Sequence, residues 1–119
     1  MFGLGHATRI YLGVEPVDMR KGFEGLYGLV RDALGHDPLS GHLFLFTNRS
    51  RSRIKALLWD GTGLWVCAKR LEKGRFRWPG SADGASIRMR PEELTMLLSG
   101  LDLTEARPRR DWFRREPAA

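Results

Sequence analysis

Two kinds of hydrophobic pattern run along this chain. The first consists of short runs rich in β-branched and aromatic residues and bounded by turn residues, which is typical of strands. These runs predict strands at residues 8–14, 42–47, 53–59, 64–69 and 86–89, and a short one at residues 76–78 that Pro79 closes. Asp60-Gly61 lies between two of the runs and predicts a tight hairpin turn there.

The second pattern places apolar residues at helical spacing and predicts a helix over residues 19–34. Its apolar positions are Phe23, Leu26, Tyr27, Val30 and Leu34. Asp18 is suited to the N-cap of this helix and Gly35 to its C-terminal cap. Three glycines fall inside it: Gly22, Gly25 and Gly28. Each disfavours the helix by about 1 kcal/mol relative to alanine, so we expect the sheet to approach the backbone closely at these positions.

A second helix is predicted to begin at Pro91, because proline suits the first helical position and the two acids after it suit the positive end of the helix dipole. Its apolar face is Leu94, Leu97 and Leu98, and Gly100 ends it. Together the patterns predict an α+β fold, a single small domain in which an antiparallel meander-containing sheet is packed by two helices. We expect this domain to cover residues 1–106, and a basic, flexible tail to follow at residues 107–119.

The positive charge of the chain is concentrated in residues 48–77. This stretch contains nine lysines and arginines against two acids, Asp60 and Glu72, so its net charge of +7 exceeds the +6 of all 119 residues. Its basic residues are Arg49, Arg51, Arg53, Lys55, Lys69, Arg70, Lys73, Arg75 and Arg77. A local positive field of this kind indicates a polyanionic partner, and the number of cations is on the scale of a groove-sized phosphate contact.

Strand geometry sharpens this prediction. Four of the basic residues are spaced by two: Arg49, Arg51, Arg53 and Lys55. An extended chain would point all four to one face and would turn Ile54, Ala56 and Leu58 into the core. In a meander, the turns at residues 48–52 and 70–73 lie at the same end of the sheet, so both basic clusters would form one surface. The alternative is an ordinary solvated edge, where cations block aggregation; the scarcity of balancing acids favours polyanion binding.

Arg20 and Lys21 form a second candidate anion site. The predicted helix places them in its first turn, where cations oppose the helix dipole. Their side chains and the nearby backbone N–H groups could converge there on a phosphate. The alternative is that both side chains reach solvent or pair with Asp18 and Glu24, and the sequence favours neither reading.

The chain offers no constellation of residues that predicts an enzyme. It has no nucleotide-binding loop, and its three histidines lack metal-ligand spacing with each other or with Cys67. Asp18 and Asp60 could hold a metal for phosphoryl transfer, but a cap and a turn explain them better, and no third acid completes a nuclease or transposase site. We therefore expect no catalysis, no cofactor and no small-molecule substrate.

An ordered series of motifs gives the chain a family resemblance. The motifs are Asp18-Met19-Arg20-Lys21-Gly22-Phe23, Ser40-Gly41-His42-Leu43-Phe44-Leu45-Phe46, Arg53-Ile54-Lys55, Trp59-Asp60-Gly61-Thr62-Gly63-Leu64, Lys69-Arg70-Leu71-Glu72-Lys73-Gly74-Arg75-Phe76 and Trp78-Pro79. In this order and spacing they closely resemble the second-open-reading-frame accessory proteins, often called TnpB-type, of the bacterial insertion-sequence family sixty-six. The resemblance covers about residues 8–103.

The resemblance implies a small accessory protein of transposition, encoded beside a separate, larger transposase that carries the acidic catalytic triad. It implies no catalysis by this chain. The family's signature positions here are Asp18, Arg20, Lys21, Gly22, Arg53, Lys55, Trp59, Asp60, Gly61, Lys69, Arg70, Glu72 and Phe76. Several of them coincide with the basic stretch, so the expected partners are DNA, at the element ends or the target, and the element's transposase.

Three functions follow as hypotheses. The first is a non-catalytic accessory factor that binds DNA phosphates through Arg20, Lys21 and the basic residues of the 48–77 stretch. The second is a protein module that docks on the transposase without direct DNA contact, with the Trp112-Phe113 tail as a possible aid. The third is a metal-dependent nuclease built around Asp18 and Asp60.

The expected compartment is the bacterial cytoplasm, with association to the nucleoid when the protein is bound to DNA. A single cysteine, Cys67, cannot form an internal disulfide, which is typical of a reducing compartment. Residues 1–14 lack the pattern of a signal peptide. No apolar run approaches the roughly 18 residues that a membrane helix needs, so we expect no membrane partner.

Overall fold

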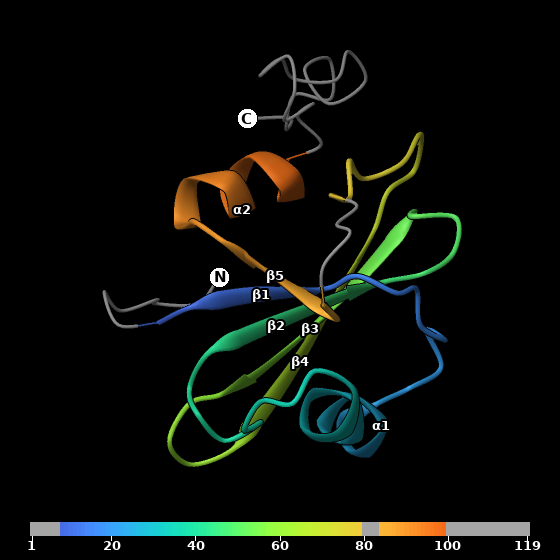
Figure 1. The fold of residues 1–119 in the computed structure, drawn as a ribbon. Helices are drawn as coiled ribbons and strands as arrows, with labels where there is room; N and C mark the ends of the chain where they lie inside the picture. The colour runs from blue at the N-terminus through green and yellow to red at the C-terminus, as the bar shows by residue number, and fades with distance from the viewer. Residues whose placement is uncertain (1–7, 80–83, 100–119) are drawn as a thin grey trace, which may run out of the picture.

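A five-stranded sheet in the order β4-β3-β2-β1-β5 forms the centre of the molecule (Figure 1). The computed structural model describes residues 8–79 and 84–99. Its strands are β1 (Ile10–Gly13), β2 (Leu43–Thr47), β3 (Arg53–Trp59), β4 (Leu64–Arg70) and β5 (Ser86–Met89). The predicted antiparallel meander is confirmed in β2, β3 and β4, while β1 pairs antiparallel with β5 and parallel with β2. The α+β class is confirmed, with a sheet that is mostly, and not wholly, antiparallel.

Helices cover both faces of this sheet (Figure 1). The first is α1 (Phe23–Gly28), which continues into a π-helical turn, η1 (Leu29–Ala33). It connects β1 to the parallel strand β2, a pairing that requires a crossover connection of this kind. The second helix, α2 (Pro91–Leu98), begins at the proline that predicted it and packs Leu94 and Leu97 on the opposite face.

Two hydrophobic clusters therefore form, one on each side of the sheet. On the α2 side the buried residues include Ile10, Leu12, Leu43, Leu45, Ile54, Ala56, Leu58, Phe76 and Trp78. On the α1 side they are Tyr11, Leu26, Val30, Phe44, Phe46 and Leu57. Because the central strands are covered on both faces, their sequences are continuously apolar, as in Leu43 to Phe46, instead of alternating.

The start of the first predicted helix is wrong. Instead of beginning at residue 19 with Asp18 as the N-cap, the helix begins at Phe23 after Gly22. The Asp18 carboxylate accepts a hydrogen bond from the backbone N–H of Arg20 at 2.8 Å, and the Asp18 carbonyl accepts one from the N–H of Lys21 at 3.1 Å. These bonds close a tight turn that competes with the helix. Its predicted end is confirmed, because Gly35 follows the last turn with φ of +70°.

The expected approach of the sheet to the helix glycines is also wrong. A Cβ atom built on Gly22 or Gly28 would meet nothing within 4 Å, and one on Gly25 would meet the side chain of Lys21. The close approach occurs instead at Gly13 in β1, where a Cβ would lie 2.9 Å from Cδ1 of Phe46. The absence of a side chain at Gly13 therefore makes room for a fully buried ring.

The predicted short strand at residues 76–78 is replaced by a buried coil. Phe76 and Trp78 are 1% and 4% exposed, and the indole N–H of Trp78 donates to the carbonyl of Gly13 at 2.9 Å. Side-chain burial, and not strand pairing, explains the apolar pattern there. The predictions for Gly100 and for the tail from residue 107 lie outside the described residues.

Replacing Gly13 by alanine should lower the free energy of unfolding by about 1–3 kcal/mol, because the new methyl group overlaps the Phe46 ring. For a domain of this size each kcal/mol shifts the melting temperature by about 4–8 °C, which circular dichroism will measure. The matched control is Gly28→Ala, at a helical position with φ of −62° and open space around it. This control should gain up to about 1 kcal/mol. Wild-type melting of the Gly13 variant would contradict the proposed packing of Phe46.

Candidate nucleic-acid interface

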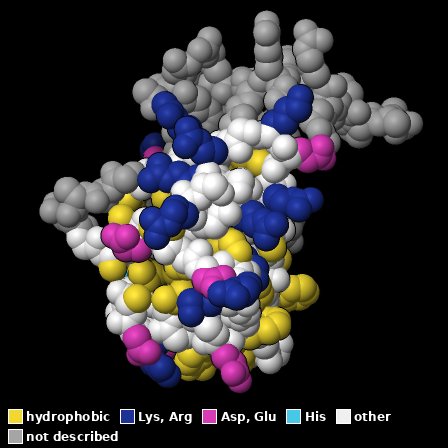
Figure 2. All heavy atoms as spheres, turned by 90° about the vertical axis from the view of Figure 1, so that its right-hand side faces the viewer, with side chains coloured by type: hydrophobic (Ala, Val, Ile, Leu, Met, Phe, Trp, Pro, Cys, Tyr) yellow, Lys and Arg dark blue, Asp and Glu magenta, His cyan; other side chains and the backbone are white. Residues whose placement is uncertain are grey.

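The two basic turns of the sequence lie side by side at one end of the sheet. The N–H of Leu71 donates to the carbonyl of Ser52 at 2.9 Å, and the N–H of Phe76 donates to the carbonyl of Arg51 at 2.7 Å. Figure 2 faces this end of the meander and shows Lys and Arg side chains gathered over it, with fewer acids among them. We call this the basic surface, made of Arg49, Arg51, Arg53, Lys55, Lys69, Arg70, Lys73, Arg75 and Arg77.

The predicted common face for four of these residues is only half right. Arg53 and Lys55 are in β3 and share the α1 face of the sheet, but residues 49–51 form a turn in which Arg51 has φ of +59°. The side chain of Asn48 explains the turn, since its carbonyl oxygen accepts the N–H groups of Ser52 and Arg53 at 2.9 and 3.1 Å. Arg49 and Arg51 are therefore exposed at the tip of the sheet and not along a strand.

Lys55 links the basic surface to the segment that precedes α1. Lys55 is half-buried, and its ammonium donates to the carbonyl of Lys21 at 2.8 Å, so the side chain is held against that segment. The contact places the Arg20-Lys21 segment, which the sequence offered as a separate site, next to the basic surface. A cleft of about 340 Å³ opens between them, lined by Met19, Arg53, Ile54, Lys55, Ala68, Lys69 and Arg70.

Lys69 makes the corresponding contact on the other side of the sheet. Its register partner is Ile54 in the α2-side cluster, and its ammonium donates to the carbonyl of Leu98 at 2.5 Å. Leu98 is the last residue of α2, where a cation complements the negative end of the helix dipole. Burial lowers the pKa of the Lys69 ammonium. Lys69 therefore supports α2, and its side chain lies on the face of the sheet opposite to Arg53, Lys55 and Arg70.

Arg20 is engaged by Asp18 and is not in the first turn of a helix. Its guanidinium binds both carboxylate oxygens, with Nη2 to Oδ2 at 2.7 Å. These hydrogen bonds from Arg20 lower the pKa of Asp18 to about 2. The helix-start phosphate site predicted for Arg20 and Lys21 is therefore wrong in its geometry, and the alternative of pairing with Asp18 holds for Arg20.

Several cations of the basic surface have no acidic partner. Arg53 and Arg70 are directly opposite each other on β3 and β4, an arrangement of like charges that destabilises a strand pair. Within residues 8–79 and 84–99, ion pairs with carboxylates are absent for Arg49, Arg51, Arg53, Arg70 and Lys73. These five cations therefore contribute a positive field that no carboxylate of the described residues neutralises by direct pairing.

The two candidate metal-binding acids lie at opposite ends of β3. Asp18 is near the start of the strand, beside Lys21, whereas Asp60 follows its last residue. The carboxylate of Asp60 accepts hydrogen bonds from the N–H groups of Thr62 and Gly63, the Thr62 hydroxyl and the Trp65 indole, and these lower its pKa to about 2. The described residues contain no group of three or more potential ligands that could hold a metal ion.

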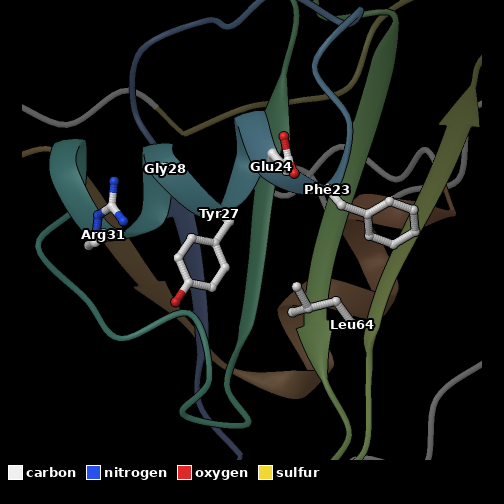
Figure 3. A pocket seen from close by; sticks show the side chains of 6 residues that line it. All are labelled: Phe23, Glu24, Tyr27, Gly28, Arg31 and Leu64. Carbon is white, nitrogen blue, oxygen red and sulfur yellow. The ribbon is translucent and has the colours of Figure 1, made fainter.

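A second hollow lies beside α1, and sequence reasoning missed it. It has a volume of about 420 Å³ and is lined by Phe23, Glu24, Tyr27, Gly28, Arg31 and Leu64. Figure 3 shows the rings of Phe23 and Tyr27 below the helix, near Leu64 on β4, while Glu24 points away. Phe23 was predicted to face the core, but the later start of the helix leaves it 54% exposed.

Of the helices in the described part of the chain, none has the length and apolar character to cross a bilayer.

The chain is similar to known proteins along most of its length. The family model described as "IS66 Orf2 like protein" matches residues 8–108. The uncharacterized protein y4jC of Sinorhizobium fredii (strain NBRC 101917 / NGR234) is 40% identical over 107 residues, which cover 90% of this chain and 91% of that protein. The uncharacterized protein y4hO of the same strain is 42% identical over 102 residues, covering 86% and 88% of the two chains. No solved structure matches the chain significantly.

The two hydrogen-bonded carboxylates predict a specific acid sensitivity. Asp18 and Asp60 have pKa values of about 2 in the fold against an ordinary 3.8. Their stabilisation is complete above about pH 4 and is lost as the pH falls towards 2, because the unfolded chain then binds more protons. Urea titrations followed by tryptophan fluorescence should show this loss. The loss of unfolding free energy between about pH 4 and pH 2 should be smaller in Asp60→Asn than in the wild type. It should be unchanged in the control Glu15→Gln, because Glu15 is an exposed acid with none of these bonds. The same loss in both variants would contradict the assignment.

Proposed function

The chain belongs to the IS66 Orf2-like family, and from this we propose that it is a non-catalytic accessory protein of insertion-sequence transposition that binds DNA through the basic surface. Family membership supports the accessory role. The DNA contact rests on one observation, the apposition of Arg53 and Arg70 within a cationic surface where neither has a carboxylate partner among residues 8–79 and 84–99. DNA and the element's transposase are the proposed partners, in the bacterial cytoplasm and at the nucleoid.

The geometry of the basic surface favours contact with phosphates over reading of bases. Its arginines are on a turn, on strand ends and in the coil after β4, and not along a helix that could enter a major groove. Arginine side chains in such positions bind phosphate oxygens through charge-assisted hydrogen bonds. Contacts of this kind orient a protein on DNA but carry little sequence information. We therefore assign the surface a sequence-weak, salt-sensitive affinity for duplex DNA.

The proposal leaves the chemistry of transposition to a separate transposase. The carboxylates of Asp18 and Asp60 are both saturated with hydrogen bonds and are separated by the length of β3. A two-metal site for phosphoryl transfer needs its metals about 4 Å apart, and hence clustered acids. This separation argues against the third hypothesis, a metal-dependent nuclease built on these two residues.

The double variant Arg53→Gln/Arg70→Gln should weaken binding to a fluorescent duplex by at least tenfold at low salt. Each lost phosphate contact should also reduce the slope of log K against log salt by about 0.9. The control Arg31→Gln/Arg88→Gln removes the same charge from η1 and from β5, the strand at the opposite edge of the sheet. Lys55 is left intact because it holds the carbonyl of Lys21. Equal losses in both double variants would mean that binding follows net charge and not this surface.

The alternative function, docking on the transposase, is favoured by the hollow beside α1. Exposed apolar residues that line a concavity often mark protein interfaces, and Phe23 is the most exposed large hydrophobic residue of the described chain at 54%. Aromatic side chains of this kind commonly provide most of the binding energy of an interface. This function does not exclude DNA binding, because the hollow and the basic surface share no lining residue.

If the hollow is the docking site, Phe23→Ala should weaken capture of the nuclease-treated transposase by roughly thirtyfold or more, the usual effect of removing a central anchor. Leu39→Ala is the matched control, since Leu39 is 42% exposed and does not line the hollow. Pull-down titrations with purified transposase, in the absence of DNA, will compare the two. Retention of the transposase by the Phe23 variant at wild-type affinity would remove the hollow as a docking site.

A further inference from the structure

The cleft beside Met19 has a shape that duplex phosphate contacts alone do not explain. Its volume of about 340 Å³ is at the lower end of the range of roughly 300–1,000 Å³ that small-molecule sites occupy. On the α1 face, where Arg53, Lys55 and Arg70 lie, its apolar lining is Met19 and Ala68. Ile54 and Lys69 also border the cleft, but their side chains lie on the α2 side of the sheet. The phosphates of a duplex need cations on an accessible surface, but they make no use of a recessed apolar wall.

The cations of this cleft differ in whether they already have a hydrogen-bond partner. Arg53 and Arg70 project from directly opposed positions and have no carboxylate partner in the described chain, so their planar guanidinium groups are available to bind a phosphate through paired hydrogen bonds. Lys55 donates to a backbone carbonyl, and an ammonium group has further donors beyond that one. A single phosphate between the arginines would also relieve the repulsion of this like-charged strand pair.

The apolar wall is held in place by the segment before α1. Met19 is half-buried and lies between Asp18, which binds Arg20, and Lys21, whose carbonyl binds Lys55. A methionine thioether is polarizable and packs well against aromatic rings. A nucleobase presents such a ring. Proteins that bind single strands commonly stack bases on aromatic side chains while cations hold the backbone, and here the thioether of Met19 would take the place of the aromatic side chain.

We propose that this cleft binds one unpaired nucleotide, with its phosphate on Arg53 and Arg70 and its base against Met19. The inference rests on the proposed DNA-binding function and adds a preference for strand ends or single-stranded segments. In a duplex the bases are stacked inside, and extracting one costs a few kcal/mol. An unpaired nucleotide enters the cleft without this cost, so a single strand should use contacts that a duplex of the same charge cannot use.

The test measures the affinity of three proteins for a short fluorescent oligothymidylate and for a duplex. The proteins are the wild type, Met19→Gln and the matched control Met96→Gln. Met96 is a similarly half-buried methionine on α2, outside the cleft. Met19→Gln should weaken oligothymidylate binding by about tenfold, the loss of one base contact, and leave duplex binding and melting temperature unchanged. Thymidine 5′-monophosphate should displace the oligonucleotide at lower concentrations than inorganic phosphate.

Wild-type affinity of the Met19 variant for oligothymidylate would overturn the inference, as would equal competition by inorganic phosphate. If the duplex still binds with the salt dependence of the basic surface, only the nucleotide cleft fails. If neither nucleic acid binds at low salt, the proposed DNA-binding function fails together with it.

Discussion

The burial of both faces of the sheet is the constraint on which the rest of the molecule depends. Because α1 covers one face and α2 with the coil at residues 71–79 covers the other, the centre of the sheet must be apolar on both sides. Charged side chains of the central strands can then reach solvent only near the strand ends and in the turns. The meander brings two such turns to the same end, so the positive charge of the sequence is concentrated there as a consequence of the packing.

The same constraint gives the lysines of the basic surface a structural role. Lys55 and Lys69 are on adjacent strands and face opposite sides of the sheet. Lys55 holds the carbonyl of Lys21 before α1, and Lys69 holds the carbonyl of Leu98 at the end of α2. Each ammonium therefore joins the sheet to one helical layer. The arginines differ from the lysines here, since within residues 8–79 and 84–99 the guanidinium groups of Arg53 and Arg70 make no hydrogen bond or ion pair with either layer.

Local patterns in the sequence predicted the elements that local chemistry determines. The run at residues 53–59 and the proline at residue 91 gave the bounds of β3 and the start of α2 correctly, because strand composition and proline geometry are local properties. The parallel pairing of β1 with β2 depends on a crossover of about 30 residues and has no local signal. The start of α1 was missed because the Asp18 turn competes with a helix over the same residues.

The candidate site shows the same division between local and tertiary information. The count of charges identified the cations, and the predicted meander placed its two turns together. The positive φ of Arg51 was not predictable, because the turn depends on hydrogen bonds to the side chain of Asn48, which the hydrophobic pattern does not indicate. Met19 appeared only as one residue of a family motif, because its position beside the cleft arises only when the Lys21 carbonyl meets Lys55. Phe23 looked like a core residue since its spacing is helical, yet the first residue of a helix has few neighbours to cover it.

One short segment connects the two candidate surfaces. Met19 lines the cleft and Phe23 lines the hollow, and Gly22 lies between them with a non-helical conformation, φ of −107° and ψ of −145°. The segment is fixed at one side by Asp18 and Lys55 and at the other by the packing of α1 on the sheet. A partner that shifts α1 would therefore also shift Met19, and a nucleotide that orders Met19 would favour one position of α1. By linkage, such coupling acts equally in both directions. If both proposed surfaces are used, the segment from Met19 to Phe23 is therefore the part of the chain through which binding at one could influence the other.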